Sequence, residues 1–64
     1  MMIAFERPLR IVNGISFRIG DEIVYGKNKT EGTISQFGGT VCYVKVPDRS
    51  VLQQVSYSEM SPKL

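Results

Sequence analysis

Turn-forming residues interrupt this chain so often that they leave no room for a long helix. Asn13-Gly14, Gly26, Gly38-Gly39 and Pro47-Asp48 separate short runs of β-branched and aromatic residues. No window places apolar residues at i, i+3, i+4 and i+7 over the roughly ten residues that an amphipathic helix needs. The pattern is typical of short strands joined by tight turns, so the sequence predicts an all-β fold.

The first turn gives the clearest local signal. Asn-Gly favours a type I′ hairpin turn, because both central residues of that turn need a positive φ. On the two sides of Asn13-Gly14, apolar residues alternate with Arg10, Ser16 and Arg18. This period of two predicts an N-terminal hairpin at 9–19 that has one apolar face and one basic or polar face.

Further strand-like runs follow the hairpin at 21–25, 30–37, 40–46 and 51–57. Gly32 lies inside one of them, where a glycine indicates a bulge or a sharp bend that lets a small sheet curl. A short 3₁₀ turn fits next, because Ser56 and Ser58 can cap it and Pro62 can end it. The sequence predicts one domain over 1–64, a small antiparallel barrel of five to six short strands with a 3₁₀ turn before the last strand.

The chain has few means of stabilising so small a fold. A domain of 64 residues buries only about 60% of the surface that its unfolded chain exposes. Cys42 is the one cysteine and cannot form an internal disulfide, and the sequence has no histidine to bind a metal. We therefore predict no metal and no cofactor, and a homo-oligomer is one way to supply the missing stability. The free cysteine fits a cytoplasmic location, and no apolar run is long enough to span a membrane.

The stretch Gly20 to Gly26-Lys27 is reminiscent of a phosphate-binding loop, but its spacing is wrong. Five residues separate the two glycines where a Walker loop has four, and Asn28 follows the lysine where that loop has serine or threonine. A phosphate loop also needs a helix after it, and residues 28–37 have the pattern of a turn and a strand. We interpret Gly26-Lys27 as a hairpin turn.

No arrangement of side chains indicates catalysis. Without histidine the usual general base is missing. Cys42 alternates with Val44 and Val46, which predicts a small buried hydrophobe rather than a nucleophile. Asp21 and Glu22 point to opposite faces of a strand, and we expect Asp21 to bond the backbone near the preceding glycine. The sequence therefore predicts no catalytic residue and no enzyme.

A face with aromatic and basic side chains is the remaining candidate site. If Cys42 faces inward, then Val41, Tyr43 and Lys45 point outward together. Interleaved aromatic and basic side chains can stack on bases and neutralise phosphates, or anchor a protein partner. The alternative interpretation is that the tyrosines cover the barrel ends and the lysines keep the domain soluble. The candidate residues for binding nucleic acid or a partner are Tyr25, Lys27, Lys29, Phe37, Tyr43, Lys45 and Arg49.

The segments IGDEIVY, GTISQF, CYVKV and QVSYSEMSP resemble the SH3-like barrels of the KOW and Tudor type. Such barrels open with a hydrophobic-Gly-Asp segment, bend at a glycine in the next strand, and close with a strand, a 3₁₀ turn and a final strand. The resemblance covers roughly residues 17–63, and the N-terminal hairpin is an addition to it. It implies a small nucleic-acid-associated binding module. The phosphate contacts it implies are Lys27, Lys29, Lys45 and Arg49, and the stacking surfaces are Tyr25, Tyr43 and Phe37.

Two alternatives stay open. A protein-interaction module or a small inhibitor would dock an edge strand or a tyrosine face on a larger protein. The layout is also similar to the type II plasmid dihydrofolate reductases, which build one active site at the centre of a tetramer from a Val-Gln-Ile-Tyr segment. Here the segment LQQVSY carries Gln53, Gln54 and Tyr57 in a different order, so the sequence departs from that family at the residues of the chemistry.

Overall fold

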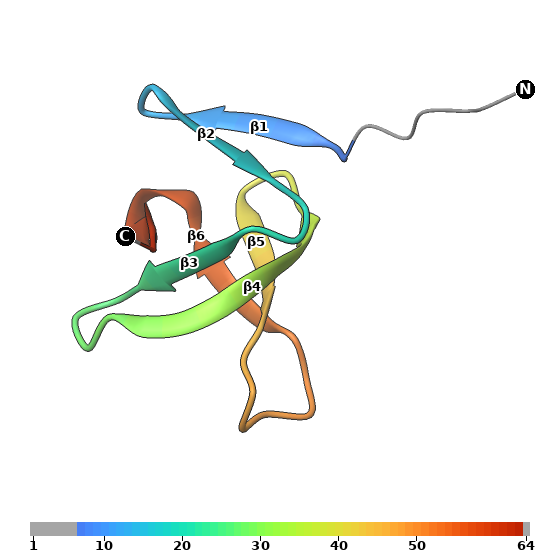
Figure 1. Cartoon of the computed structure of the whole chain (residues 1–64), viewed down its shortest axis with the longest axis vertical. Helices are drawn as coiled ribbons and strands as arrows, with labels where there is room; N and C mark the ends of the chain where they lie inside the picture. Colours follow the sequence, from blue (N-terminus) through green and yellow to red (C-terminus); the bar gives the residue numbers. More distant parts are fainter. Residues whose placement is uncertain (1–6, 64) are drawn as a thin grey trace, which may run out of the picture.

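The structure is a computed structural model that describes residues 7–63, and it consists of two antiparallel sheets (Figure 1). The first sheet is a hairpin of two strands, and the second has five strands and includes one turn of 3₁₀ helix. The elements are β1 (Leu9–Val12), β2 (Ile15–Arg18), β3 (Glu22–Tyr25), β4 (Thr30–Phe37), β5 (Val41–Lys45), β6 (Gln53–Ser56), η1 (Tyr57–Glu59) and β7 (Met60–Pro62). The predicted all-β fold with a 3₁₀ turn before the last strand is confirmed. Residues 7–63 form seven strands rather than the predicted five to six.

The five-stranded sheet has the order β6-β5-β4-β3-β7, and it curls strongly (Figure 1). Pairing of β7 with β3 brings the end of the described chain back to the first strand of this sheet. The two edge strands, β6 and β7, do not pair with each other, so the barrel is not closed. The connection between them is the 3₁₀ turn η1 rather than the tight two-residue turn that would align them as a hairpin.

Alternation along the strands sends one set of side chains into a single core. On β5, Cys42 and Val44 are fully buried and Val46 follows them inward, as the sequence predicts. The neighbouring strands add inward residues that pair with them in register, such as Ile34 opposite Val44 and Val55 opposite Cys42. The buried core consists of Phe17, Ile23, Ile34, Cys42, Val44, Val46, Val55 and Met60.

The bulge in β4 does not lie at Gly32. The register between β4 and β5 shifts between Ile34 and Gln36, two residues further along. Gly32 is needed for a different reason, because a Cβ at this position would overlap Cγ1 of Val44. The glycine therefore allows a close approach between β4 and β5, and the expectation of a bulge at Gly32 is wrong.

The 3₁₀ turn is held by its backbone rather than by its serines. Ser56 occupies the N-cap position, but its side chain makes no capping hydrogen bond. At the other end, the Met60 N–H donates to the carbonyl oxygen of Tyr57 and the chain returns to an extended conformation. Pro62 lies within β7 and does not end the turn, so the role expected of this proline is wrong.

The N-terminal hairpin turns at Asn13 and Gly14, whose φ angles of 50° and 79° suit a type I′ turn. Its register places Ile11 opposite Ser16 and Val12 opposite Ile15. Cross-strand partners share a face, so Val12 lies on the same side as Ile15 and Phe17. Leu9 and Ile11 lie on the opposite side, together with Ser16. The expected single apolar face is therefore absent. Phe17 is buried with the core, whereas Ile11 remains 64% exposed.

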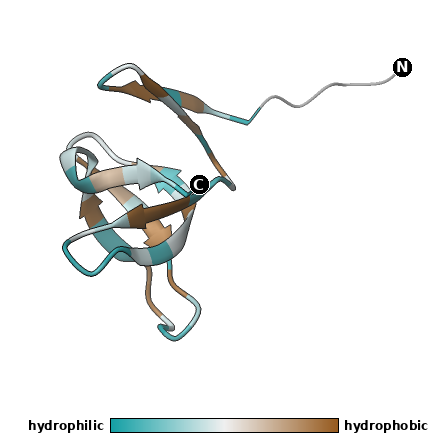
Figure 2. Ribbon diagram, turned by 60° about the vertical axis from the view of Figure 1, so that its left-hand side comes forward, coloured by the Kyte–Doolittle hydropathy of each residue, from teal (hydrophilic) through white to brown (hydrophobic). Residues whose placement is uncertain are grey.

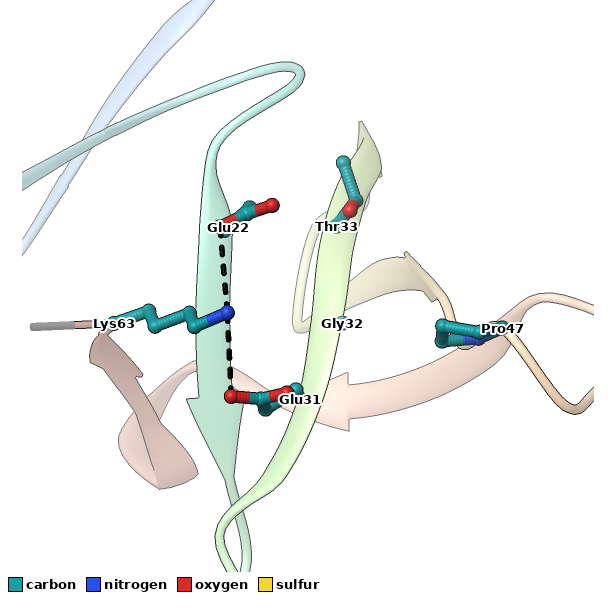
Figure 3. A pocket seen from close by; sticks show the side chains of 6 residues that line it. All are labelled: Glu22, Glu31, Gly32, Thr33, Pro47 and Lys63. Carbon is teal, nitrogen blue, oxygen red and sulfur yellow. Dashed lines mark ion pairs between the residues drawn. The ribbon is translucent and has the colours of Figure 1, made fainter.

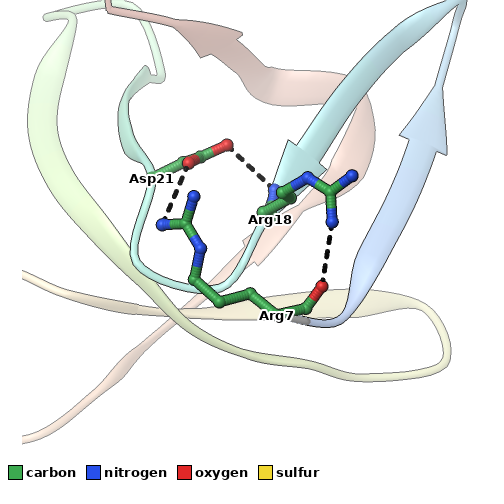
Figure 4. Close-up of polar contacts among 3 residues, drawn as sticks. All are labelled: Arg7, Arg18 and Asp21. Carbon is green, nitrogen blue, oxygen red and sulfur yellow. Dashed lines mark hydrogen bonds and ion pairs between the residues drawn. The ribbon is translucent and has the colours of Figure 1, made fainter. Parts of the chain in front are cut away.

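The junction between the hairpin and the larger sheet is organised by Asp21 (Figure 4). Its Oδ2 accepts a hydrogen bond of 2.9 Å from the backbone N–H of Arg18, which confirms the predicted backbone contact near Gly20. Its Oδ1 lies 3.8 Å from the guanidinium of Arg7. The guanidinium of Arg18 in turn donates to the carbonyl oxygen of Arg7, so the polar contacts link both ends of the hairpin to the first turn of the sheet.

Candidate functional site

The structure separates the predicted aromatic residues into two groups. Tyr25 and Phe37 are half-buried and pack against the core. Tyr25 alternates with the buried Ile23, and Phe37 pairs with the inward-facing Cys42. Both rings therefore cover the core, and neither lies on the outer face of β5 with Tyr43.

The outer face of β5 has the predicted orientation. Val41 and Tyr43 are half-buried and Lys45 is exposed, while the residues between them are buried. Tyr43 pairs with Gln36 on one side and with Gln54 on the other. The sequence prediction placed Tyr43 and Lys45 outward and did not anticipate these two glutamines.

Lys27 and Lys29 lie in the turn between β3 and β4, and both are exposed. Gly26 and Lys29 have φ angles of 74° and 51°, and the Lys29 N–H donates to the Gly26 carbonyl oxygen. A strand rather than a helix follows this turn, which agrees with its interpretation as a hairpin connection. Arg49 is exposed in the loop between β5 and β6, where its N–H donates to the Val46 carbonyl oxygen.

The β3–β4 turn and the β5–β6 loop both lie at the end of the sheet that is remote from the N-terminal hairpin (Figures 1 and 2). The β5–β6 loop also presents two aliphatic side chains to solvent. Val51 is 70% exposed and Leu52 is 39% exposed. This end of the molecule thus combines basic and aliphatic side chains on connections that lie outside the core.

An open hollow of about 100 Å³ is lined by residues of β3 and β4, by Pro47 of the β5–β6 loop and by Lys63, which follows β7 (Figure 3). Lys63 lies between two carboxylates there, 3.6 Å from Glu22 and 3.2 Å from Glu31. The hydrogen bond and charge of Glu31, with the charge of Glu22, raise the pKa of Lys63 above its usual value. Lys63 bridges the two carboxylates and offsets one of their two negative charges, so we interpret the hollow as an exposed clasp for the end of β7.

The remaining basic side chains divide by their contacts. Arg7 and Lys63 form the ion pairs of residues 7–63, with Asp21, Glu22 and Glu31 as partners. Four exposed basic residues take no part in any of these pairs: Lys27, Lys29, Lys45 and Arg49. The carboxylates outside the pairs in the same range are Asp48 and Glu59, so positive charge is in excess among the unpaired groups.

Arg10 makes a polar network that sequence reasoning missed. Its guanidinium donates to the Gly38 carbonyl oxygen at 2.5 Å and to the Tyr57 hydroxyl at 2.6 Å. The guanidinium carbon lies 4.6 Å from the centre of the Tyr57 ring, and the Tyr57 hydroxyl also donates to the Gly38 carbonyl oxygen. These three residues come from β1, the β4–β5 loop and η1, so the network fastens the hairpin to the larger sheet.

Two residues of the segment LQQVSY are therefore occupied by internal contacts. Tyr57 belongs to the Arg10 network, and the Gln53 side chain donates to the Val51 carbonyl oxygen. Nearby, burial raises the pKa of the Cys42 thiol, and the positive charge of Arg10 opposes this only in part. A buried thiol with a raised pKa is a poor nucleophile.

Residues 7–63 bring no three His, Cys, Asp or Glu side chains together as a metal site. The same part of the chain has no helix with the length and apolar character of a membrane span. Comparison of the chain with protein-family models, with curated proteins and with solved structures finds no match.

Proposed function

We propose that this protein is a small binding module for nucleic acid. The proposed surface comprises the β3–β4 turn, the β5–β6 loop and the outer face of β5. One observation carries the proposal: the four exposed basic residues outside the ion pairs all belong to these three elements. They are Lys27, Lys29, Lys45 and Arg49. No catalytic group is required of the surface.

Unpaired surface cations suit phosphate binding for a physical reason. A cation already held by a carboxylate must give up that partner before it can bind a phosphate, whereas an exposed free cation only displaces water and counterions. Arg7 and Lys63 are of the first kind, and Lys27 and Arg49 are of the second. Phosphates therefore have ready partners at the end of the molecule away from the hairpin.

The sequence of elements at the end of the sheet supports the resemblance to SH3-like barrels, which implies the same function. The sheet ends with a strand, a 3₁₀ turn and a final strand, which agrees with the layout of those modules. The proposal differs from the sequence prediction in one respect. Tyr25 and Phe37 pack against the core, so the proposed stacking surface is Tyr43 alone.

Salt-dependent binding tests the proposal. Fluorescence anisotropy with labelled DNA and RNA oligonucleotides of about 15 residues should show an affinity whose logarithm falls linearly with the logarithm of salt concentration. The combined Lys27→Ala, Lys45→Ala and Arg49→Ala variant should bind single strands more weakly and with a flatter slope, by about 0.7 for each phosphate that is no longer neutralised. Lys63→Ala removes a cation that is already paired and serves as the control. Absence of binding at low salt would refute the proposal.

A second candidate function is protein interaction, and the exposed aliphatic residues of the β5–β6 loop favour it. Val51 and Leu52 lie beside Arg49 in a loop that can insert into a pocket of a partner. The double variant Val51→Ser and Leu52→Ser changes no core residue. In a pull-down, the double variant should no longer recover a stoichiometric protein partner, whereas the charge variants should still recover it. Equal recovery by both kinds of variant would exclude this loop as the binding element.

A further inference from the structure

Three polar or aromatic side chains form a row across the outer face of the five-stranded sheet. Tyr43 on β5 is directly opposite Gln36 on β4 and Gln54 on β6. Cross-strand partners lie on the same face with Cβ atoms about 5 Å apart. We call these three residues the Gln-Tyr-Gln row.

The β-bulge in β4 creates this arrangement. Ile34 points into the core, and strict alternation would send Gln36 inward and Phe37 outward. The register shift between Ile34 and Gln36 reverses that order, so Gln36 is exposed and Phe37 covers the core. Bulges commonly re-aim a side chain in this way beside functional sites.

The ring of Tyr43 packs closely against Gly38. A Cβ at Gly38 would come within 3.1 Å of ring atom Cε2, so the ring lies close to the glycine backbone. The Gly38 carbonyl oxygen accepts hydrogen bonds from Arg10 and Tyr57, which fix this loop in place. A ring held in this way loses little side-chain entropy when a flat ligand stacks on it.

The two glutamines of the row have free hydrogen-bonding groups. None of the side-chain hydrogen bonds formed within residues 7–63 uses the amide of Gln36 or Gln54, and both residues are exposed. Each amide offers two donors and one acceptor group, which suits the mixed donors and acceptors at the edge of a base. The row therefore presents an aromatic surface between two groups that can bond a base edge.

Charge on the same face favours nucleic acid over a protein ligand. Lys45 follows Tyr43 by two residues on β5 and points to the same side, about 7 Å further along the strand. The one carboxylate on the three strands of the row is Glu31, at the end of β4 remote from Gln36, where it is paired with Lys63. A base on Tyr43 therefore leaves Lys45 available on the same side of β5 for a neighbouring phosphate.

We propose that the Gln-Tyr-Gln row binds one unpaired base of single-stranded nucleic acid. This inference rests on the proposed function and specifies its substrate. The base stacks on Tyr43, the amides of Gln36 and Gln54 bond its edge, and Lys45 neutralises an adjacent phosphate. A duplex keeps its bases stacked inside, so it meets the cations of this surface but not the ring.

Variants of Tyr43 give the sharpest test. In anisotropy titrations with matched single-stranded and duplex oligonucleotides, Tyr43→Leu should weaken single-strand binding about 5- to 150-fold, the range for loss of one stacked base. The salt slope should not change, because no cation is removed. Tyr43→Phe keeps the stacking surface and should bind within about twofold of the original protein. Ser56→Ala, an exposed position on the same face, should bind normally.

The glutamine variants distinguish a loss of binding from a folding defect. Gln36→Ala and Gln54→Ala remove exposed side chains, so their thermal unfolding should match the original protein. Each should reduce the difference in affinity among homopolymers of the four bases. A preference for single strands that disappears in Tyr43→Leu supports the inference.

Failure of this inference and failure of the proposed function give different results. Equal binding of single strand and duplex, unaffected by Tyr43→Leu but weakened by the charge variants, overturns the inference and leaves the proposed function intact. Absence of any binding at low salt overturns both. The inference is also overturned if the protein binds no nucleic acid but recovers a protein partner, and Tyr43→Leu no longer recovers it. The row would then be assigned to that partner.

Discussion

The five-stranded sheet and the N-terminal hairpin are stabilised in different ways. Each strand of the sheet sends alternate residues into one core, and its outer face is polar or only partly apolar. The hairpin contributes a single fully buried side chain, Phe17, and leaves Leu9 and Ile11 46% and 64% exposed. Figure 2 shows hydrophobic residues on hairpin strands that stand apart from the curled sheet.

The comparison shows how the N-terminal hairpin, which cannot bury a whole face, is held in position. A two-stranded hairpin is marginal by itself in water. Here one aromatic anchor, Phe17, and one basic side chain, Arg10, join it to residues that are far away in the sequence. The sheet, in contrast, is held by a continuous backbone ladder. The hairpin is either an integral part of the fold or a separate attachment, and variants in the two regions distinguish these possibilities.

Phe17→Ala should have the largest effect. Removing a buried phenylalanine costs about 3–5 kcal/mol, and a domain of this length has a total stability of roughly 3–10 kcal/mol. We expect the whole chain to lose its cooperative unfolding transition in urea, because the Phe17 ring is part of the core. Ile15→Ala, on the same strand but 39% exposed, is the control and should unfold close to the original midpoint. An unchanged midpoint for Phe17→Ala would make the hairpin a separate attachment.

Gly32→Ala should have the next largest effect and should act on the sheet alone. The added methyl group overlaps Val44, so β4 and β5 must separate slightly, at a cost of about 1–3 kcal/mol. Gly39→Ala is a matched change in the β4–β5 loop, where a Cβ meets nothing within 4 Å. Chemical denaturation should place Gly39→Ala within about 0.5 kcal/mol of the original protein. Equal destabilisation of both variants would argue against close packing as the cause.

Arg10→Ala should weaken the attachment of the hairpin without loosening the sheet. The variant lacks two charge-assisted hydrogen bonds in a partly buried site, and we expect its stability to fall by about 1–2 kcal/mol. Amide hydrogen exchange should accelerate in β1 and β2 and stay nearly constant in β4 and β5. Arg49→Ala, a change at an exposed arginine without such side-chain bonds, provides the control. Uniform acceleration across both sheets would show that the network supports the whole fold.

Alternation along single strands made much of the fold predictable. The inward set on β5, the Asn13-Gly14 turn and the backbone contact of Asp21 all depend on residues close in sequence. The faces of the hairpin were predicted wrongly because each strand was considered separately. Counting outward from the two-residue turn pairs Val12 with Ile15 and Ile11 with Ser16, and that register places apolar residues on both faces of the hairpin.

The candidate site was less predictable because a bulge and long-range contacts determine it. Tyr25 lies two residues after the buried Ile23 on β3, so alternation along the strand could have predicted its inward position. The inward position of Phe37 and the outward position of Gln36 depend on one inserted residue in β4, which alternation does not reveal. The Arg10 contact to Tyr57 spans 47 residues, and only the assembled sheet brings these two side chains together.

The smallest predicted effect concerns the other end of the chain, where exposed ion pairs take the place of the Arg10 network. Lys63 has its pKa raised by Glu31 and Glu22, so folding favours the charged lysine. The resulting stabilisation is complete below the unfolded pKa of 10.5 and disappears as the pH rises through the folded value. The difference in unfolding free energy between the original protein and Lys63→Gln should therefore be constant near neutral pH and shrink above about pH 10.5.

Salt provides an independent check on this exposed clasp. Ion pairs in water are screened over about 8 Å at physiological ionic strength and over about 3 Å at 1 M. Added salt should therefore bring the stabilities of the original protein and Lys63→Gln together, while the destabilisation in Arg10→Ala should change less because its site is partly buried. If both effects fell equally with salt, the two ends of the chain would be held by the same kind of interaction. A smaller salt response for Arg10 would instead establish that the hairpin end is held by directional hydrogen bonds and the β7 end by screened charge.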